Sequence, residues 1–430
     1  MRGLIFTYVL TYGGALASLT NPFIGLLVYV CFAIIKPERT WPWSVPQGNY
    51  SRIVAIAFLI GWAAAGFGRW QFGRAKQIVT TLLLFVVWMV ASASAAPDST
   101  IAWDFAEIFF KTALPVLAGM TLVDSYEKLR ALAWTIVVST GLVAFFENEK
   151  YYAGLVEVGD NFTAHQALVG VGMAFFLGVY TTALWKRLIA FGCAALLVHT
   201  VMFNMSRGAM VGVAATVVMI LLVIPKYPKY IVPLVLALAV VGRLAGDNVR
   251  EEFSTIFSSE DERDASAQSR FDLWADMFDA TLNHPILGLG PSHWPLVAEQ
   301  YGWPAGKEGH GLWSQVTAEF GFPGGVLYLG FFVLTLIRLW PIARPARDRL
   351  DDESARLARM AITSIFGFVC EAQFGSFKAM EVAYYAVLLG AATIAVSSVP
   401  GPTGQPVSER PLSNPSKTAR LDQESQDQAP

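Results

Sequence analysis

The sequence predicts an all-α fold, a polytopic membrane bundle of about 12–13 transmembrane helices with one long loop outside the membrane. Of the 430 residues, 54% are hydrophobic and 15% are charged, whereas soluble domains carry about 25% charged residues. Apolar runs of roughly 16–20 residues recur along the chain, and each can cross a hydrocarbon core about 30 Å thick. The three cysteines lie in these runs without metal-like spacing, so neither a metal site nor a disulfide framework is expected.

Thirteen apolar segments are the candidate spans. The first two are joined by Thr20 and Asn21 alone, so they form either two crossings or one crossing and a re-entrant piece, and both twelve and thirteen spans remain open. The segments lie near residues 4–19, 22–35, 53–68, 77–96, 105–123, 129–146, 165–184, 188–205, 208–225, 229–245, 311–339, 357–375 and 380–398.

Basic residues mark the cytoplasmic ends of these segments, because positively charged loops stay in the cytoplasm. An even number of spans separates each successive pair of clusters, so all five clusters can share that side. The clusters are Arg69, Arg74 and Lys76; Lys128 and Arg130; Lys186 and Arg187; Lys226 and Lys229; and the six arginines Arg338, Arg344, Arg347, Arg349, Arg356 and Arg359.

The chain divides into four predicted parts. Residues 1–245 form an N-terminal transmembrane bundle, and residues 246–310 form a long extracytoplasmic loop rich in Asp and Glu. Residues 311–398 supply the last transmembrane helices. The tail, residues 399–430, is rich in Pro, Ser, Gln and charge with almost no aromatic residues, a composition that predicts a disordered cytoplasmic segment.

Arg207 interrupts an apolar stretch that is too long for one membrane crossing. As a single helix, residues 188–223 would extend about 54 Å, so the chain must turn, and Ser206-Arg207-Gly208 is the clearest place. The turn lies at the extracytoplasmic surface. An arginine at this interface can simply snorkel. A lipid-linked diphosphate is the functional alternative, because guanidinium binds phosphate oxygens in a bidentate manner.

Arg270 lies at the start of a predicted helix in the long loop. The apolar residues that follow recur at helical spacing, so this helix is expected to lie on the membrane surface or at the mouth of the bundle. Ser266 or Ser269 is its predicted cap, and an arginine near a helix N-terminus favours anions. Pairing with an acidic neighbour such as Asp272 is the plain alternative. The apolar face consists of Phe271, Trp274, Phe278 and Leu282.

His310 precedes a short predicted helix at the membrane surface. If residues 311–320 are helical, His310, Ser314 and Thr317 share a polar stripe. Glu319 is nine residues further on, about 13 Å along the axis and on another face. It therefore cannot pair with His310 and is expected to hold the helix to a neighbour. A lone interfacial histidine is commonly structural, so a catalytic role needs further support.

Other polar residues lie near the same surface. His165, in the sequence Asp-Asn-Phe-Thr-Ala-His-Gln, is at a membrane entrance, where it either contacts substrate or serves in capping and packing. Four polar residues cluster at the last outward turn, and they either line the path of an acceptor or belong to a solvated loop. They are Glu371, Gln373, Lys378 and Glu381.

Three stretches resemble the signature of the O-antigen ligase and O-antigen polymerase superfamily. They are NMSRGA at Asn204–Ala209, SAQSRFDLW at Ser266–Trp274 and EGHGLWSQVTAEFGFPGG at Glu308–Gly325. The resemblance implies that Arg207 and Arg270 hold the diphosphate of a lipid carrier and that His310 acts on the acceptor hydroxyl. Ser206, Ser314, Glu319 and His165 are the predicted supporting residues.

The resemblance also implies the reaction. The donor is a glycan linked to undecaprenyl diphosphate, the acceptor is a glycan, lipid or protein, and transfer takes place on the outer face of the bacterial cytoplasmic membrane. Neither metal nor cofactor nor nucleic acid is expected to take part. Gly311 departs from the pattern, because many members have Asn or Ser there. The start of the chain, with NPFIGLLVYV and the Lys-Pro-Glu-Arg that follows, looks like the O-glycosylation ligases associated with exosortase systems.

Two alternative functions remain open. A polymerase that joins repeat units uses the same donor, and the motifs do not separate it from a ligase. A transporter or flippase would instead show charged residues deep within its spans and an internal repeat. The sequence shows neither feature, apart from His199 and Lys111 within apolar segments.

Overall fold

The computed structural model describes residues 2–155, 161–244, 265–345, 352–376, 378 and 380–398, and this part of the chain is helical without strands. Nine of its helical segments are long and apolar enough to cross a membrane, and two shorter helices are also apolar. The all-α polytopic class is therefore confirmed. Fewer long spans are described than the predicted twelve or thirteen, because helices such as α3 (Pro22–Ile35) and α11 (Arg207–Val223) are only 14 and 17 residues long.

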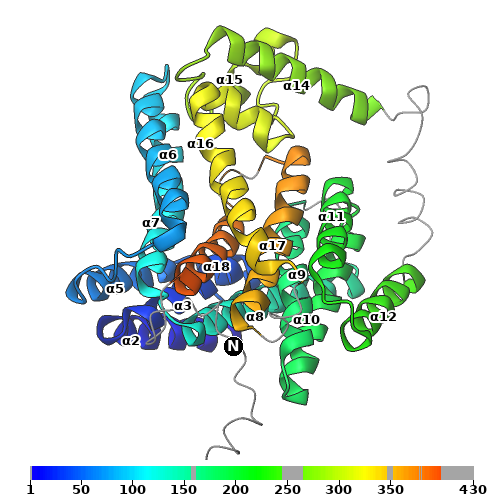
Figure 1. Ribbon diagram of the computed structural model, residues 1–430. Coiled ribbons are helices and arrows are strands. Elements are labelled where there is room, and N and C mark those ends of the chain that lie inside the picture. The colour runs from blue at the N-terminus through cyan, green and yellow to red at the C-terminus, as the bar shows by residue number, and fades with distance from the viewer. Residues whose placement is uncertain are drawn as a thin grey trace, which may run out of the picture.

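The helices pack side by side as one bundle (Figure 1). The first half contains α1 (Arg2–Tyr8), η1 (Val9–Gly13), α2 (Gly14–Thr20), α3, α4 (Pro37–Thr40), α5 (Tyr50–Ala64), η2 (Gly73–Ala75), α6 (Lys76–Ala95), α7 (Ser99–Leu122), α8 (Tyr126–Tyr152) and α9 (Asn161–Tyr180). The second half contains α10 (Leu184–Phe203), α11, α12 (Pro228–Leu244), α14 (Ala265–Asn283), α15 (Trp294–Val297), η4 (Ala298–Tyr301), α16 (Leu312–Ala343), α17 (Glu353–Glu371), η6 (Ala372–Phe374) and α18 (Glu381–Ser398).

The centre of the bundle is α18, in which every side chain from Val382 to Ile394 is buried. It packs against α17, α16, α7 and α8. The hydroxyl groups of Tyr328 and Tyr384 both donate to the carbonyl oxygen of Lys378, over 2.8 and 2.7 Å. The backbone just before α18 is thereby tied to α16.

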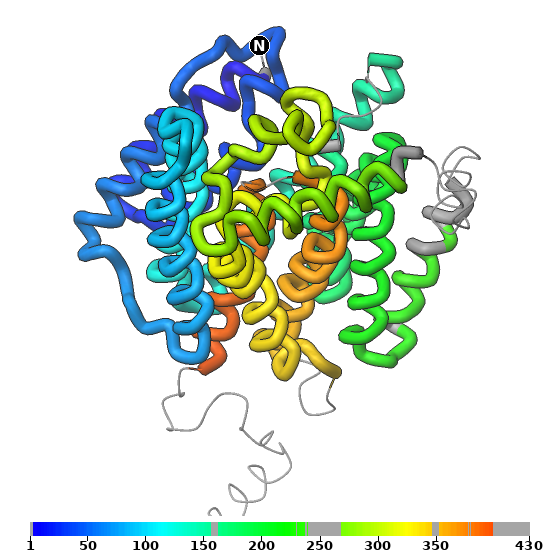
Figure 2. Tube along the Cα trace, turned by 90° about the horizontal axis from the view of Figure 1, so that it is seen from above, coloured from blue at the N-terminus to red at the C-terminus, as the bar shows by residue number. Residues whose placement is uncertain are grey.

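The described residues of the five basic clusters lie at one end of the bundle. Figure 2 shows the end of α16, the start of α17, the α11–α12 connection and the end of α18 toward the lower edge of the view. Arg69 and Lys128 both form ion pairs with Asp124, at 3.5 and 2.8 Å, and Arg130 pairs with Glu353 at the start of α17 at 2.7 Å. Arg359 on α17 donates a hydrogen bond to the Tyr180 hydroxyl over 3.0 Å. The rings of Tyr180 and Tyr230 pack together with their centroids 5.9 Å apart. The even spacing of the clusters along the chain therefore corresponds to a shared end.

A kink in α16 forms where the sequence predicts a helix break. Gly321 has φ 70° and ψ 179°, outside the helical region. The loop after α14 packs into the kink so closely that a Cβ atom at Gly321 would lie 2.1 Å from the carbonyl oxygen of Ile286. The backbone N–H groups of Phe322 and Gly290 bond to the carbonyl oxygens of Pro285 and Glu319, over 2.9 and 3.0 Å. A glycine is needed here because the backbone must adopt this conformation without a side chain.

The helix α14 lies across α16 and α17 rather than along them, as Figure 2 shows. Leu273 and Met277 are buried, whereas Phe271, Phe278 and Leu282 are exposed on the other face. The helix already begins at Ala265, so the predicted capping by Ser266 or Ser269 is wrong, because both lie within the first turns. Residues 246–264 of the predicted loop and the predicted disordered tail, residues 399–430, lie outside the described residues.

Candidate functional site

Arg207 is the first residue of α11, at the turn that the sequence predicts. The preceding helix ends at Phe203, and the side chain of Ser206 caps α11 by accepting a hydrogen bond from the N–H of Ala209 over 3.4 Å. Met205 has a positive φ of 53°, which reverses the chain within a few residues. Ser206 therefore supports the turn through the backbone. Arg207 is half-buried at the start of α11, whereas Lys226 of the basic clusters follows the other end of this helix.

The three predicted motif residues come from elements that meet around Phe374 and Trp274. A Cβ atom at Gly208, the neighbour of Arg207, would lie 2.5 Å from the Cβ of Phe374. The ring of Phe374 packs edge-on against Trp274, with centroids 6.2 Å apart. Trp274 is one helical turn from Arg270, and its Nε1 would lie 2.5 Å from a Cβ at Gly311, next to His310.

This packing explains the glycine at position 311. An Asn or Ser side chain at position 311 would collide with the indole of Trp274. The chain has Gly311 in place of the Asn or Ser of many family members because Trp274 occupies the space that such a side chain would need. Within the described part of the chain, the indole N–H of Trp274 is buried without a hydrogen-bond acceptor. Sequence reasoning assigned Trp274 to an apolar face and did not single out Phe374. No local signal marks either residue as a junction, because the contacts join segments far apart in the chain.

His310 lies just before α16 rather than on it. Its φ is +44°, Gly311 is the N-cap, and the helix begins at Leu312. The predicted polar stripe of His310 with Ser314 and Thr317 is therefore wrong, because the helical phase does not extend back to His310. A left-handed conformation is uncommon for a residue with a side chain and persists where surrounding contacts enforce it.

The surroundings of His310 favour its neutral form. Burial lowers the pKa of the imidazole below its usual value, and the positive charges of Lys307 and Arg270 lower it further. A neutral imidazole with an available ring nitrogen can accept a proton, so the environment suits a general base.

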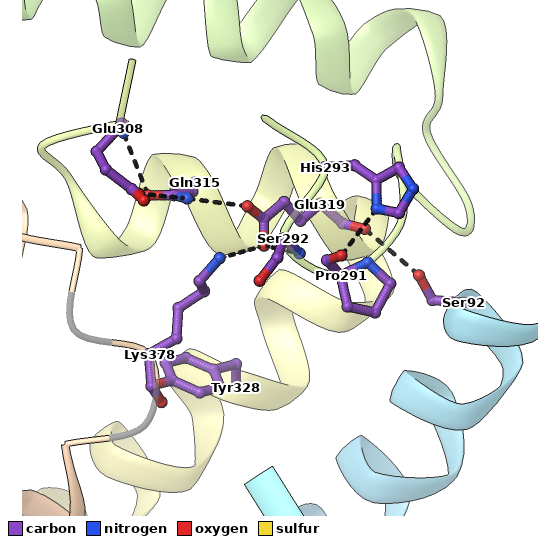
Figure 3. Close-up of polar contacts among 10 residues, drawn as sticks. Ser92, Pro291, Ser292, His293, Glu308, Gln315, Glu319, Tyr328 and Lys378 are labelled. Atoms are coloured by element: carbon purple, nitrogen blue, oxygen red, sulfur yellow. Dashed lines mark hydrogen bonds and ion pairs between the residues drawn. The ribbon is translucent and has the colours of Figure 1, made fainter. Parts of the chain in front are cut away.

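Gln315 holds the backbone before His310 in place. Its side-chain oxygen accepts a hydrogen bond from the N–H of Gly309 over 3.3 Å, and its amide nitrogen donates to Glu308 over 3.3 Å and to Glu319 over 2.9 Å. Gln315 is fully buried, and Figure 3 shows it between the two carboxylates. Buried polar groups with their partners satisfied rigidify a site, so the conformation at His310 is supported by the first turn of α16.

Glu319 ties α16 to two other segments and does not approach His310 as a partner. Its carboxylate accepts a hydrogen bond from the N–H of Ser292 over 2.9 Å and pairs with the Lys378 ammonium over 2.6 Å (Figure 3). The ammonium also lies over the ring of Phe105, 5.2 Å from the ring centroid. The sequence predicts that Glu319 holds the helix to a neighbour, and these contacts identify the neighbours.

The buried pair leads to an expected result for Lys378→Met. Removal of one member of a buried ion pair leaves an uncompensated charge and costs about 3–5 kcal/mol. We expect the purified variant in detergent to show a markedly lower midpoint of thermal unfolding. In the double variant Glu319→Gln/Lys378→Met no such charge remains, so much of the loss should be recovered. A single variant as stable as the wild type would mean that the pair does not hold the loop to the bundle.

His165 and Glu371 form a second buried pair, behind the start of α11. The imidazole Nδ1 contacts a carboxylate oxygen of Glu371, and the side chains are only 2% and 0% exposed. A Cβ at Gly208 would lie 3.7 Å from Cε1 of His165, and one at Gly212 would lie 2.7 Å from the Cβ of Glu371. The alternative of a solvated loop is therefore wrong for Glu371. The pair packs directly against the first turns of the helix that begins with Arg207.

Ser314 and Thr317 lie on the first turns of α16 and line a groove with Trp274 and Trp313. The Thr317 hydroxyl donates to the carbonyl oxygen of Trp313 over 2.7 Å. The structure thus brings Ser314 near the predicted site, although not on one helical stripe with His310.

His293 and His199 have structural surroundings. The Nδ1–H of His293 donates to the carbonyl oxygen of Pro291 over 2.8 Å, and its Nε2 accepts from the N–H of Asp98 over 3.0 Å. These bonds pin the long loop to the start of α7. His199 contacts the side chain of Asn148 and stacks on the ring of Tyr152.

Comparison with known proteins gives two matches to family models. The model described as O-antigen ligase matches residues 192–329, a range that contains Arg207, Arg270 and His310. A family of unknown function (DUF5935) matches residues 1–154. No curated protein matches the chain. The O-antigen ligase match and the apolar helical bundle agree with the sequence motifs: residues 192–329 of this multi-pass membrane protein are similar to the O-antigen ligase family.

Proposed function

We propose that the protein transfers a glycan from undecaprenyl diphosphate to an acceptor hydroxyl on the outer face of the bacterial cytoplasmic membrane. The family match supports membrane glycan transfer in general. The observation that carries the specific proposal is the meeting of three elements around Phe374 and Trp274, which draws together the residues next to Arg207, Arg270 and His310. Two guanidinium groups and a neutral imidazole suit a reaction that releases a diphosphate and takes up a proton.

The proposed step is a single displacement at the anomeric carbon. The oxygen of the acceptor hydroxyl forms a new bond to that carbon, and the bond from the carbon to the diphosphate oxygen breaks. The hydroxyl proton passes to the neutral imidazole of His310. The bonding electrons leave with the diphosphate, so negative charge grows on its bridging oxygen as the bond lengthens.

Arg207 and Arg270 are assigned to the departing diphosphate. A planar guanidinium offers two parallel N–H donors that match phosphate oxygens. Fixed positive charge where negative charge develops lowers the barrier most in a site that excludes water. The Ser206 cap, the buried His165–Glu371 pair and the Glu319–Gln315 network are assigned supporting roles, because they fix the backbone around Arg207 and His310. That the reaction needs neither a metal ion nor a cofactor remains a prediction from the sequence.

The pH dependence follows from the charges around His310. A lowered pKa keeps the imidazole neutral to lower pH, so activity should fall only when the pH drops below the ordinary value for histidine. Lys307→Met removes one of the positive charges that lower this pKa, so we expect the acidic limb of the kcat/KM profile to move to higher pH. The measurement is a rate profile for both proteins over about two pH units on either side of the ordinary histidine value. An unshifted or downward-shifted limb would contradict the assignment of that limb to His310.

Ligase and polymerase activities differ in the size of the product. We propose a ligase, of the O-glycosylation type that the N-terminal sequence resembles, and the polymerase of the same superfamily is the alternative. Purified protein in vesicles would receive an undecaprenyl-diphosphate glycan of one repeat unit. A ligase yields an acceptor that carries this one unit and leaves the donor unextended. Donor molecules with several repeat units would identify a polymerase.

Transport without catalysis is a more remote alternative. A transporter would move the intact donor across the vesicle membrane without a new glycosidic bond. The ion pair between Glu107 and Lys111, at 2.6 Å, lies within α7 but both side chains are exposed at the outside of the bundle. Because both side chains are exposed, the pair is not a charge buried within a span, and it lends transport no support. We also propose that the chain is divided into the four parts predicted from the sequence and that the active side of the protein is extracytoplasmic.

A further inference from the structure

The helices α3, α5 and α7 form a hollow of about 500 Å³ on the side of the bundle, apart from the candidate site. Both α5 and α7 lie at the edge of the bundle that is away from α10, α11 and α12 (Figure 1). The hollow is lined by Tyr29, Ala55, Phe58, Leu59, Trp103, Glu107, Phe110, Lys111, Leu114 and Pro115.

The floor of the hollow is fixed by a contact between α3 and α7. Pro115 has no N–H, so the carbonyl oxygen of Lys111 lacks its usual bond within the helix. The hydroxyl of Tyr29 donates to this oxygen over 2.9 Å. The ring of Tyr29 also stacks on Phe58 of α5, with centroids 6.4 Å apart, and both side chains are buried. The backbone beneath Lys111 is therefore held by two other helices.

An ion pair lies on the exposed side of this hollow, halfway along a membrane-spanning helix. The Lys111 ammonium is 2.6 Å from the Glu107 carboxylate, and the two side chains are 63% and 67% exposed. Lys111 is twelve residues beyond Ser99 in a helix of 24 residues, which places it about 18 Å along an axis of about 36 Å. The charges therefore face the middle of the hydrocarbon layer rather than its surface.

Such a pair is incompletely satisfied when it faces lipid. An ammonium has three donors and a carboxylate accepts several hydrogen bonds, and charged groups in the hydrocarbon layer are costly unless they are paired. Among the described residues, no ion pair joins Glu107 or Lys111 to another helix. The surrounding surface is apolar, with Trp103, Phe110 and Leu114 all exposed on the same helix. The face thus has the apolar rim and polar centre of an interface between membrane helices.

We propose that this face of α7 is the interface between two copies of the chain, in which Glu107 of each copy pairs with Lys111 of the other. The inference goes beyond the proposed function and does not depend on it. Two copies in one membrane have the same orientation, so a two-fold axis between them runs along the membrane normal. In such an interface the contact of one residue with another is repeated with the roles exchanged.

The charges favour a second copy as the occupant. One face carries one carboxylate and one ammonium, a single turn apart, so the face is complementary to itself. Around the two-fold axis the four charged groups alternate in sign, and each gains a second partner of opposite charge. The net charge of the four groups is zero. Polar contacts of this kind hold membrane helices together.

Charge reversal tests the pairing directly. Glu107→Lys places two ammonium groups on the face, and Lys111→Glu places two carboxylates there. Each variant alone should fail to associate, because like charges then meet across the interface. A mixture of the two variants should form heterodimers, and the exchanged variant Glu107→Lys/Lys111→Glu should form homodimers. Glu299→Lys, an exposed reversal on the outer loop, is the matched control.

Association would be measured by energy transfer between copies that carry a donor or an acceptor fluorophore at the C-terminus, in vesicles over a series of protein-to-lipid ratios. We expect the dissociation constant to rise roughly tenfold or more in each single variant, the scale of one polar contact between membrane helices. The mixture, the exchanged variant and Glu299→Lys should match the wild type. A monomeric wild type, unchanged single variants, a mixture without heterodimers or an equal loss in Glu299→Lys would overturn the inference.

Disulfide crosslinking locates the interface independently of the charges. In a chain whose three native cysteines are replaced by serine, Leu114→Cys puts a thiol on α7 one turn beyond Lys111, and Leu222→Cys is the control on the exposed face of α11. Mild oxidation of the purified protein in vesicles should give Leu114→Cys a product of twice the mass of the chain. Monomer alone, or an equal yield from Leu222→Cys, would show that α7 does not face a second copy.

Discussion

We expect His310→Gln to lower kcat by about 10²–10⁴-fold, the usual contribution of a positioned general base. Glutamine retains hydrogen bonding and similar size but cannot take up a proton near neutral pH. The backbone at His310 is held by Gln315 and by the packing of Gly311 on Trp274, so the variant should fold normally. Initial rates of glycan transfer at saturating donor would measure the effect, and donor binding should survive because the arginines hold the diphosphate.

A matched control is available on the same long loop. His284 is exposed at the end of α14, so His284→Gln should transfer glycan at the wild-type rate. The contrary result for His310 would be a variant with near-normal kcat and a lowered midpoint of thermal unfolding. That combination would identify His310 as a packing residue, and the base would have to be sought elsewhere.

The second large effect concerns Arg207. We expect Arg207→Lys to lower kcat by about 10²-fold, the scale of one lost donor to a developing negative charge. The lysine ammonium keeps the charge but cannot reproduce the planar two-donor geometry of guanidinium. Arg270→Lys should be milder, because Arg270 acts in part through its field on the site, as its effect on the His310 pKa indicates.

Arg187→Lys is the matched control for these substitutions. Arg187 is exposed at the opposite end of the bundle, where its Nε–H donates to the carbonyl oxygen of Thr181 over 3.1 Å. Its replacement should leave transfer unchanged. Full activity of Arg207→Ala at a normal level of protein in the membrane would exclude a diphosphate-binding role for Arg207.

Hydropathy and chain length predicted the main features of the fold. An apolar run too long for one crossing required a turn at Ser206, and α11 begins at Arg207. The Gly-Pro-Gly-Gly segment predicted a break, which is present as the kink at Gly321. Among the described residues, some predicted spans form helices shorter than the long membrane-crossing ones, because hydropathy records an apolar run and not how many of its residues form a regular helix. The short helix α3 is an example.

The contacts within the site could not be predicted in the same way. Glu319 and Lys378 are 59 residues apart, and their pairing depends on how α16 packs beside the segment before α18. The left-handed backbone of His310 is set by Gln315 and Trp274, and no local pattern indicates it. The sequence alone does single out Arg207, Arg270 and His310 as candidates, because charged groups beside apolar helices are rare.

The central claim is that a glycan leaves a diphosphate carrier in a reaction that depends on His310. The most direct measurement is the stoichiometry of that reaction with purified protein in vesicles, a glycosylated undecaprenyl diphosphate and an acceptor. We expect one free undecaprenyl diphosphate for each glycan attached to the acceptor, and both products should fall together in His310→Gln. Glycosylated acceptor without released undecaprenyl diphosphate, or donor that crosses the membrane unchanged while no acceptor is glycosylated, would contradict the account.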